Sequence, residues 1–399
     1  MKVLVTPLFM STHLTEMVPI CWALRSAGHE VLVAGDPDIR VATLSAGLNF
    51  AEIGKPVDLS GDSDVALSPD LFPVEAMASR TTEEGRIWWE ECAKSFVPHA
   101  AGLIGKYLEL AEDWQPDLVL VDSMSLLGWL LGAAVKAPAV HYHACVVPLT
   151  GPFEEKSREL LAPVCEELGL PGLTEPDLVL DPVPASLQAV DARPGVKIRY
   201  LPYNGTGVLP DWVREPKTKP RVCVTFGSVT AMTGPRPFRA VMDALEGIPE
   251  SDAEIVVTLS PANRKLLGPF PEHVRVAEYL PLNLFLESCD LVIHHGGTAT
   301  GMTAAALGVP VLVLPQWGNS FDYGQGLADA GAGVSLASRA EQEDVAGIRK
   351  TITTMLTDPS FKAAAAKMRA EMEAAVPQHR VAHELGELAA GRPAFADER

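Results

Sequence analysis

The segment LVIHHGGTATGMTAAALGVPVLVLPQ, residues 291–316, constrains the fold of this chain more than any other. It opens with a short continuous apolar run at 291–293, which predicts a strand buried in a parallel sheet. Glycines and threonines follow, and the alanine-rich stretch 302–307 predicts a helix that ends at a glycine. A second buried strand is predicted at 311–314. Because a glycine-rich turn before a helix presents free backbone N–H groups and a helix dipole, the turn predicts a phosphate or diphosphate site. The alternative is an ordinary turn whose glycines allow tight packing.

The rest of the chain repeats this alternation of strand and helix. In the first half, strands are predicted at 2–6, 30–34, 117–121 and 139–143, with helices at 15–27 and 126–134. In the second half, strands are predicted at 221–226, 254–259, 274–277 and 333–336, beside the two within 291–316. Region 54–100 has weak periodicity and predicts loops and short helices. Strand-helix-strand units imply parallel, doubly wound sheets, so the predicted fold class is α/β with two similar halves.

Length and composition limit the class of protein. At 399 residues the chain is longer than one ordinary core supports, which predicts two domains of about 100 to 200 residues each. Its 47% hydrophobic and 21% charged residues are typical of a globular protein. The formal net charge of -19 argues against nucleic acid and anionic membranes as partners, because their phosphates would be repelled. The six scattered cysteines and the lack of a membrane-length apolar run predict a cytoplasmic protein.

The chain changes character between its halves. Residues 204–220 are rich in proline and glycine and predict a linker. We therefore expect an N-terminal domain at 1–203 and a C-terminal domain at 221–375. The last helical segment, 376–399, is expected to return to the N-terminal domain.

The turns after the strands carry the candidate chemistry, since open α/β sheets bind ligands beyond the carboxyl ends of their strands. The turn at residues 7–13 contains no glycine, which argues against a dinucleotide-binding fingerprint. His13 stands at the start of the following helix, and Asp122 ends a strand at the same edge. A neutral imidazole can remove a proton from an alcohol while a carboxylate stabilises the imidazolium. The pair predicts a catalytic dyad, whereas each residue alone is equally well explained as a helix-start or N-cap residue.

Two residues of the second half add to the predicted phosphate site. Ser228 follows the strand at 221–226 and is expected to offer its hydroxyl and backbone N–H to the phosphate. Tyr279 follows the strand at 274–277, where its ring could stack on a base. A core or edge tyrosine is the alternative.

Metal sites are less well supported. Asp36 with Asp38, and Asp62 with Asp64, form D-x-D pairs, but acidic turn residues are usually only solvated. His141 shares a strand face with His143, and the sequence places no third ligand near them. No metal is therefore expected.

Together, His13, Asp122, Ser228, Tyr279 and the HHGGTAT turn resemble the GT-B glycosyltransferases, in particular the inverting actinobacterial enzymes that attach deoxysugars to antibiotics. The resemblance runs the full length of the chain. The family motif reads HHGGAGT followed by GVP and LP. This chain has HHGGTAT, with threonine and alanine in place of alanine and glycine, followed by GVPVLVLP. The resemblance implies two Rossmann-like domains that face each other across a cleft.

The resemblance also implies the roles of individual residues. His13 corresponds to the general base and Asp122 to its carboxylate partner. His294 is the favoured histidine donor to the diphosphate, and Tyr279 stands where relatives usually have a base-stacking tryptophan. The implied nucleotide-sugar site comprises Ser228, Tyr279, Leu280, His294, Gly296, Gly297, Thr298, Thr300, Asn319, Ser320 and Asp322. The implied acceptor site in the N-terminal domain comprises Phe9, Trp88, Trp89, His141 and Tyr142.

One departure from the family concerns the donor sugar. Many relatives have Asp-Gln where this chain has Asn319 and Ser320, and those two side chains bind sugar hydroxyls. Asparagine lacks the charge that strengthens such hydrogen bonds. We therefore expect a donor sugar with few hydroxyls, such as a dideoxysugar.

The predicted reaction is a single displacement with inversion. His13 removes the acceptor proton while the helix dipole helps the nucleoside diphosphate to leave, without metal or other cofactor. The expected partners are a dTDP-deoxysugar and a polyketide aglycone, with an aromatic one favoured. The sequence leaves open dTDP versus UDP, a C- or O-glycosidic product, a homodimer, and a helper protein. The alternatives are a nucleotide-sugar epimerase of the same architecture, a macrolide-type O-glycosyltransferase, and a non-catalytic sugar-nucleotide-binding homologue.

Overall fold

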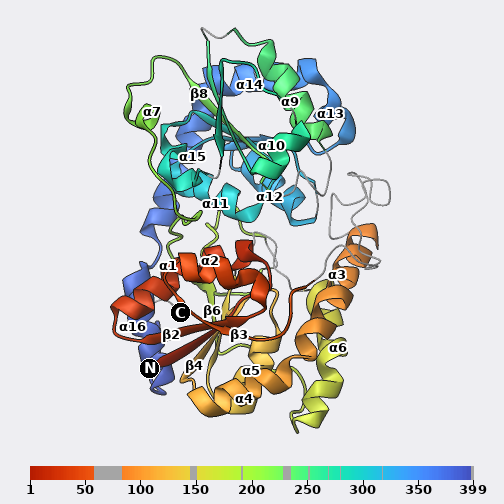
Figure 1. Cartoon of the computed structure of the whole chain (residues 1–399), viewed down its shortest axis with the longest axis vertical. Coiled ribbons are helices and arrows are strands. Elements are labelled where there is room, and N and C mark those ends of the chain that lie inside the picture. Colours follow the sequence, from red (N-terminus) through yellow and green to blue (C-terminus); the bar gives the residue numbers. More distant parts are fainter. Residues whose placement is uncertain are drawn as a thin grey trace.

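The protein folds into two α/β domains, each built on one parallel sheet, and Figure 1 shows one domain above the other. This computed structural model describes residues 1–57, 83–143, 151–189, 192–227, 235–249, 252–267, 269–278, 280–316 and 318–396. Within these ranges, no helix is both long enough and apolar enough to cross a membrane.

The N-terminal sheet has the strand order β3-β2-β1-β4-β5-β6-β7, with all neighbours parallel. Its strands are β1 (Lys2–Thr6), β2 (Glu30–Gly35), β3 (Asn49–Glu52), β4 (Leu118–Asp122), β5 (Ala139–Tyr142), β6 (Leu178–Asp181) and β7 (Val196–Lys197). The helices of this domain are α1 (Ser11–Ser26), α2 (Arg40–Ser45), α3 (Glu83–Ala101), α4 (Ile104–Trp114), α5 (Leu127–Val135) and α6 (Pro152–Glu167). Helices cover both faces, which explains why the central strands are apolar throughout.

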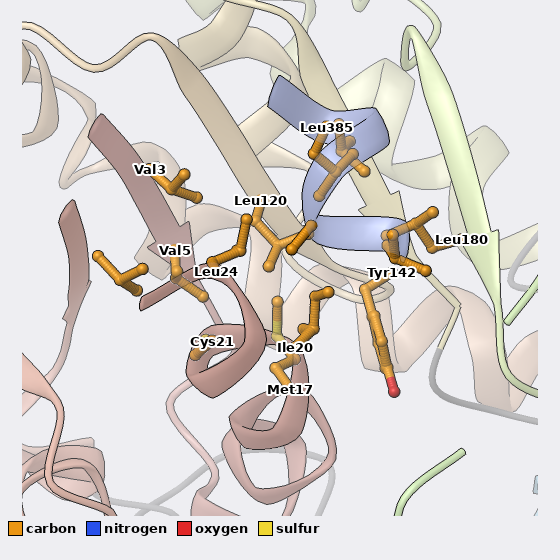
Figure 2. Close-up of a cluster of buried hydrophobic side chains, with 14 of the residues drawn as sticks. Val3, Val5, Met17, Ile20, Cys21, Leu24, Leu120, Tyr142, Leu180 and Leu385 are labelled. Atoms are coloured by element: carbon orange, nitrogen blue, oxygen red, sulfur yellow. The ribbon is translucent and has the colours of Figure 1, made fainter. Parts of the chain in front are cut away.

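The side chains of β1 alternate between two cores. Val3 and Val5 face α1, whereas Leu4 faces the core that α3, α5 and α6 cover. Helix α16 (Gln378–Ala389), at the far end of the sequence, places Leu385 in the same core as α1 (Figure 2). The chain therefore returns to its first domain after completing the second.

The C-terminal sheet has the order β10-β9-β8-β11-β12-β13. Its strands are β8 (Arg221–Thr225), β9 (Glu254–Leu259), β10 (Val274–Glu278), β11 (Leu291–His294), β12 (Val311–Val313) and β13 (Gly333–Ser335). Its helices are α9 (Arg236–Glu246), α10 (Pro261–Leu267), α11 (Thr298–Leu307), α12 (Gly318–Asp329), α13 (Arg339–Glu343), α14 (Val345–Thr357) and α15 (Pro359–Ala374). Helices α11, α12 and α15 cover one face, and α9 and α14 cover the other. The short helix α7 (Asp211–Arg214) lies between the two sheets in sequence.

The predicted α/β class and parallel sheets are confirmed, and three strands escaped prediction. Strand β3 lies at the sheet edge and is half exposed, and β7 has only two residues, so neither has a clear apolar run. Strand β6 is short and ends in an aspartate. In region 54–100, the predicted short helices are wrong for the described part, because α3 is one long helix packed along α6.

Candidate active site

Two side chains meet where α1 begins and β4 ends. His13 lies in the first turn of α1, and Asp122 is the last residue of β4. The Nδ1 atom of His13 is 3.1 and 3.0 Å from the two carboxylate oxygens of Asp122. The backbone N–H of Met124 donates to Oδ1 of Asp122 at 2.8 Å, which holds the carboxylate in place. With the proton on Nδ1, the Nε2 atom of His13 is a hydrogen-bond acceptor.

The electrostatic surroundings of His13 suit a base. Burial by itself lowers the pKa of the imidazole, but the charge of Asp122 and the hydrogen bond to it outweigh burial, so the pKa of His13 is raised. The side chain of His13 is 17% exposed, whereas that of Asp122 is fully buried. The pair can therefore take a proton from a molecule beside it and stabilise the resulting charge.

A second carboxyl group lies one helical turn further along α1. Glu16 is buried, and its pKa is raised well above the ordinary value, first by burial and then by the charge of Asp122. Burial and the charge of Asp122 therefore both favour the neutral form of Glu16, which would add no second negative charge beside His13. Its spacing of three residues from His13 places both on one helix face, and this spacing is visible in the sequence.

The glycine-rich turn connects β11 to α11, and α11 contacts α1 of the other domain (Figure 1). Gly297 caps the helix without a side-chain hydrogen bond, so the first N–H groups of α11 remain available to a ligand. Gly296 has a φ of 89°, and a Cβ there would lie 2.4 Å from Cβ of Ser320. The turn thus requires glycine for both conformation and space. Thr298 and Thr300 lie in the first turn of α11 and are half-buried.

The two histidines of this turn have different surroundings. The Nδ1 atom of His294 accepts the backbone N–H of Gly296 at 3.0 Å, and its ring lies against Tyr323, so His294 is buried behind the turn. His295 lies between two turns: a Cβ on Gly297 would be 2.6 Å from its Nε2, and one on Gly227 would be 3.4 Å from its Cε1. Burial lowers the pKa of His295 to about 4, so the ring is neutral. Nε2 of His294 is buried and has no hydrogen-bond partner among the described residues, so His294 also keeps a ring nitrogen for a ligand, and both histidines are candidate donors to the turn.

The start of α12 adjoins the turn. The side-chain N–H of Asn319 donates to Oγ1 of Thr298 at 3.2 Å, which places the Asn319 side chain at the start of α11. Ser320 instead is fully buried, and its Oγ accepts the backbone N–H of Gln316 at 3.0 Å. The structure thus gives Ser320 a role in holding the turn, in place of the predicted sugar contact. Asp322 is half-buried on the same helix.

Other predicted nucleotide-sugar residues are less informative. Leu280 is partly buried and packs against the core under α11. Ser228 and Tyr279 lie outside the described residues.

The predicted acceptor residues separate into different environments. Phe9 lines a hollow beside the dyad. Trp88 and Trp89 are buried, with ring centroids 4.6 Å apart. His141 is buried against Trp129.

Tyr142 belongs to the core beneath α1 and is 1% exposed (Figure 2), so its predicted contact with a ligand is not retained. His141 and Tyr142 are neighbours on one strand and point to opposite faces of the sheet, so they cannot line the same pocket. This alternation follows directly from the sequence once both residues are assigned to one strand.

The hollow beside the dyad lies between the loop before α1 and the turn after β4. It is partly enclosed, and its lining is mostly apolar. Its lining comprises Pro7, Leu8, Phe9, Asp36, Phe96, Val97, His99, Ala100, Leu103, Tyr107, Met124, Ser125, Leu126, Leu127 and Leu161. Phe96 and His99 were not among the predicted site residues, because nothing local in the sequence connects α3 to this edge of the sheet.

The acidic pairs have other roles where they are described. Asp36 is hydrogen-bonded to His99, and Asp38 accepts the backbone N–H of Val57. Asp62 and Asp64 lie outside the described residues. In the part of the chain that the structure describes, no three histidine, cysteine or acidic side chains gather as metal ligands would.

Comparison with known proteins matches nearly the whole chain. A family profile described as "Erythromycin biosynthesis protein CIII-like" matches with its N-terminal domain at residues 22–227 and its C-terminal domain at 239–388. Aklavinone 7-beta-L-rhodosaminyltransferase of Streptomyces galilaeus is 32% identical over 94% of this chain and 92% of its own length. L-demethylnoviosyl transferase of Streptomyces niveus is 33% identical over 93% of this chain and 94% of its own length.

Solved structures agree with these sequence matches. Spinosyn rhamnosyltransferase SpnG has a TM-score of 0.89 and 41% identity over 97% of this chain and 100% of its own. It has also been solved with spinosyn aglycone and with thymidine diphosphate. The glycosyltransferase SnogD from Streptomyces nogalater has a TM-score of 0.75 and 29% identity over 97% of this chain and 99% of its own. All four of these proteins are named as transferases, and none as an epimerase.

Proposed function

Because the chain belongs to the erythromycin biosynthesis protein CIII-like family and is a GT-B glycosyltransferase, we propose that it transfers a deoxysugar from a dTDP-sugar to a polyketide aglycone, with inversion. The observation that carries the proposal is the hydrogen bond between His13 and Asp122 at the edge that faces α11. The His13–Asp122 pair supplies a base on one side of the interdomain space. The turn before α11 supplies a leaving-group site on the other side.

The proposed reaction is a single displacement. Nε2 of His13 removes the proton of an acceptor hydroxyl, and the oxygen attacks the anomeric carbon of the sugar. A new carbon–oxygen bond forms as the bond from the anomeric carbon to the diphosphate oxygen breaks, and its electron pair leaves with dTDP. Asp122 stabilises the imidazolium that results. A phenolate acceptor could also attack through its ring carbon with the same base.

The donor half rests on the turn between β11 and α11. The N–H groups of the first turn of α11, its helix dipole and the neutral His295 can together stabilise a departing diphosphate. Thr298 and Thr300 add hydroxyl groups at the same helix start. The family member SpnG, solved with thymidine diphosphate, supports dTDP as the nucleotide of the donor. Asn319, with no charge, supports a sugar with few hydroxyls.

The acceptor half rests on the hollow beside His13. Its apolar lining, with Phe9 at the loop that precedes His13, suits a hydrophobic ring system. SpnG has been solved with a spinosyn aglycone and one relative is named for aklavinone, which supports a polyketide as the acceptor.

The proposal can be tested with purified protein, a panel of dTDP-sugars and polyketide aglycones. We expect dTDP release that depends on the aglycone, a product with the opposite anomeric configuration by NMR, and faster turnover of deoxysugar donors than of glucose donors. His13→Ala should abolish transfer and leave dTDP binding unchanged. Full activity in that variant, or release of an isomerised free sugar without aglycone, would contradict the mechanism.

A further inference from the structure

The first turn of α12, which carries Asn319, lies against α3 of the other domain. Gly318 is the first residue of α12, and a Cβ there would lie 2.6 Å from Cζ3 of Trp88 and 3.2 Å from its Cε3 and Cη2. The outer ring of the Trp88 indole therefore lies directly on the backbone of Gly318. Phe321, one turn further along α12, is 4% exposed and belongs to the same N-terminal core cluster as Trp88. The start of α12 is thus seated on the N-terminal domain.

The C-terminal domain holds the same turn of α12 from the other side. The side-chain N–H of Asn319 donates to Oγ1 of Thr298 at 3.2 Å. A Cβ on Gly296 would lie 2.4 Å from Cβ of Ser320. Thr298 and Gly296 belong to the glycine-rich turn and the start of α11, where the diphosphate is proposed to bind. The first turn of α12 is therefore clamped between that turn and Trp88.

The clamp leaves little room for movement. Trp88 is 8% exposed, and its ring centroid lies 4.6 Å from that of Trp89, so the buried indole has few places to go. Because carbon atoms pack about 3.5 to 4.0 Å apart, a methyl group at Gly318 would displace the start of α12 by about 1 Å. Hydrogen bonds tolerate donor–acceptor distances of only about 2.7 to 3.2 Å, so a shift of that size breaks a hydrogen bond from Asn319.

We propose that Trp88 is a positioning residue for the donor sugar: packed on Gly318, it fixes the start of α12 and with it a hydrogen bond from Asn319 to a sugar hydroxyl. The inference rests on the proposed function and adds a residue of the N-terminal domain to the donor site. It places Trp88 on the donor side, whereas the family resemblance implies the acceptor side. Trp88 acts through Asn319 and takes no part in bond making.

Calorimetry with two nucleotides tests the proposal. We would measure the binding of dTDP and of dTDP-2,6-dideoxyglucose to the wild-type protein and to Gly318→Ala. Gly318 lies in a helix and is not among the glycines with a positive φ, so alanine is otherwise suited to the position. We expect the variant to bind the sugar nucleotide about 10-fold more weakly, as loss of one hydrogen bond provides, and to bind dTDP unchanged.

The contact can also be altered from the other side. Nε1 of Trp88 has no hydrogen-bond partner among the described residues, so Trp88→Phe breaks none of them and removes only the outer ring atoms. Trp88→Phe should weaken the sugar nucleotide alone. The double variant Trp88→Phe/Gly318→Ala should recover most of the affinity, because the methyl group fills the space that the outer ring leaves. The matched control is Gly105→Ala in α4, where an added Cβ would meet no atom within 4 Å, and both nucleotides should bind it as they bind wild type.

A further variant tests whether Trp88 acts through Asn319. Asn319→Ala should weaken the sugar nucleotide about 10-fold. Adding Gly318→Ala to Asn319→Ala should cause no further loss, because the hydrogen bond is already absent. Losses that multiply in this double variant would overturn the proposal.

Three other results would also overturn it. They are unchanged binding of the sugar nucleotide in both Gly318→Ala and Trp88→Phe, a Trp88→Phe/Gly318→Ala variant weaker than either single variant, and an equal loss for dTDP and the sugar nucleotide. The last result is what a merely structural tie between the domains predicts. Failure of the wild-type protein to bind dTDP would instead refute the proposed function.

Discussion

Replacing Asp122 by asparagine isolates the electrostatic part of the proposed dyad. The substitution keeps the shape of a fully buried side chain and removes its charge. A hydrogen bond to a charged group contributes about 1.5 to 3 kcal/mol. At about 1.36 kcal/mol for each factor of ten, losing it from the imidazolium-like transition state lowers kcat about 10- to 150-fold.

The hydrogen bonds around Asp122 predict a further loss. The N–H of Met124 donates to Oδ1, so the carbonyl of an asparagine would occupy that position and its NH₂ group would face Nδ1 of His13. Nδ1 would then accept a hydrogen, and the proton of the imidazole would move to Nε2, where it blocks proton removal from the acceptor. The total loss in kcat should reach about 10²- to 10⁴-fold, the usual range for general-base catalysis.

The assay is the initial rate of aglycone-dependent dTDP release at saturating donor, over a range of pH. Because the base must be unprotonated, wild-type activity should rise as the pH increases through the raised pKa of His13. In Asp122→Asn, burial lowers that pKa without compensation, so the rise should move to lower pH. Asp117→Asn, just before the start of the same strand, is the matched control and should retain wild-type kcat. A kcat for Asp122→Asn within threefold of wild type, with unchanged dTDP affinity, would refute the dyad.

Three further predictions concern neighbouring residues. His295→Ala should weaken dTDP binding about 10-fold in calorimetry, through loss of one hydrogen bond to a charged phosphate. His294→Ala should mainly lower the melting temperature. The reverse pattern would assign the phosphate contact to His294. Glu16→Gln should melt at a higher temperature than wild type above neutral pH. Because the pKa of Glu16 is raised in the folded protein, its stabilising contribution is complete below the unfolded pKa and is lost as the pH rises through the folded pKa. A difference in melting temperature between Glu16→Gln and wild type that is the same at pH 5 and pH 9 would contradict the burial of Glu16 as an acid. Asn319→Asp should raise the kcat/KM ratio of dTDP-glucose over dTDP-2,6-dideoxyglucose about 10-fold; an unchanged ratio would remove Asn319 from the sugar site.

Some of the prediction followed from patterns that are local in the sequence. Continuous apolar runs that end in glycine or a polar residue identified the central strands, because a strand buried on both faces has no polar side to interrupt it. The same reasoning placed Asp122 at a strand end and His13 at a helix start. Their hydrogen bond could be anticipated, since parallel strands bring all their carboxyl ends to one edge of the sheet.

Other features depend on packing between distant segments. His99 and Asp36 are far apart in sequence, and only the packing of α3 against the sheet edge joins them. Which of His294 and His295 borders the glycine turn depends on Tyr323 and on Gly227 of a separate loop. Ser320 has the hydroxyl expected of a ligand contact. Its Cβ, however, packs closely against Gly296, and its hydroxyl oxygen accepts the N–H of Gln316.

The sequence by itself therefore determined the two-sheet architecture, the family and the sheet edges where ligand contacts are predicted, because strand burial, helix periodicity and glycine turns are encoded by neighbouring residues. The tertiary structure decided which side chains reach those edges and in what protonation state. Side-chain direction depends on the steric fit of neighbouring elements, and pKa depends on burial and on charges such as that of Asp122, which approach only when the chain has folded.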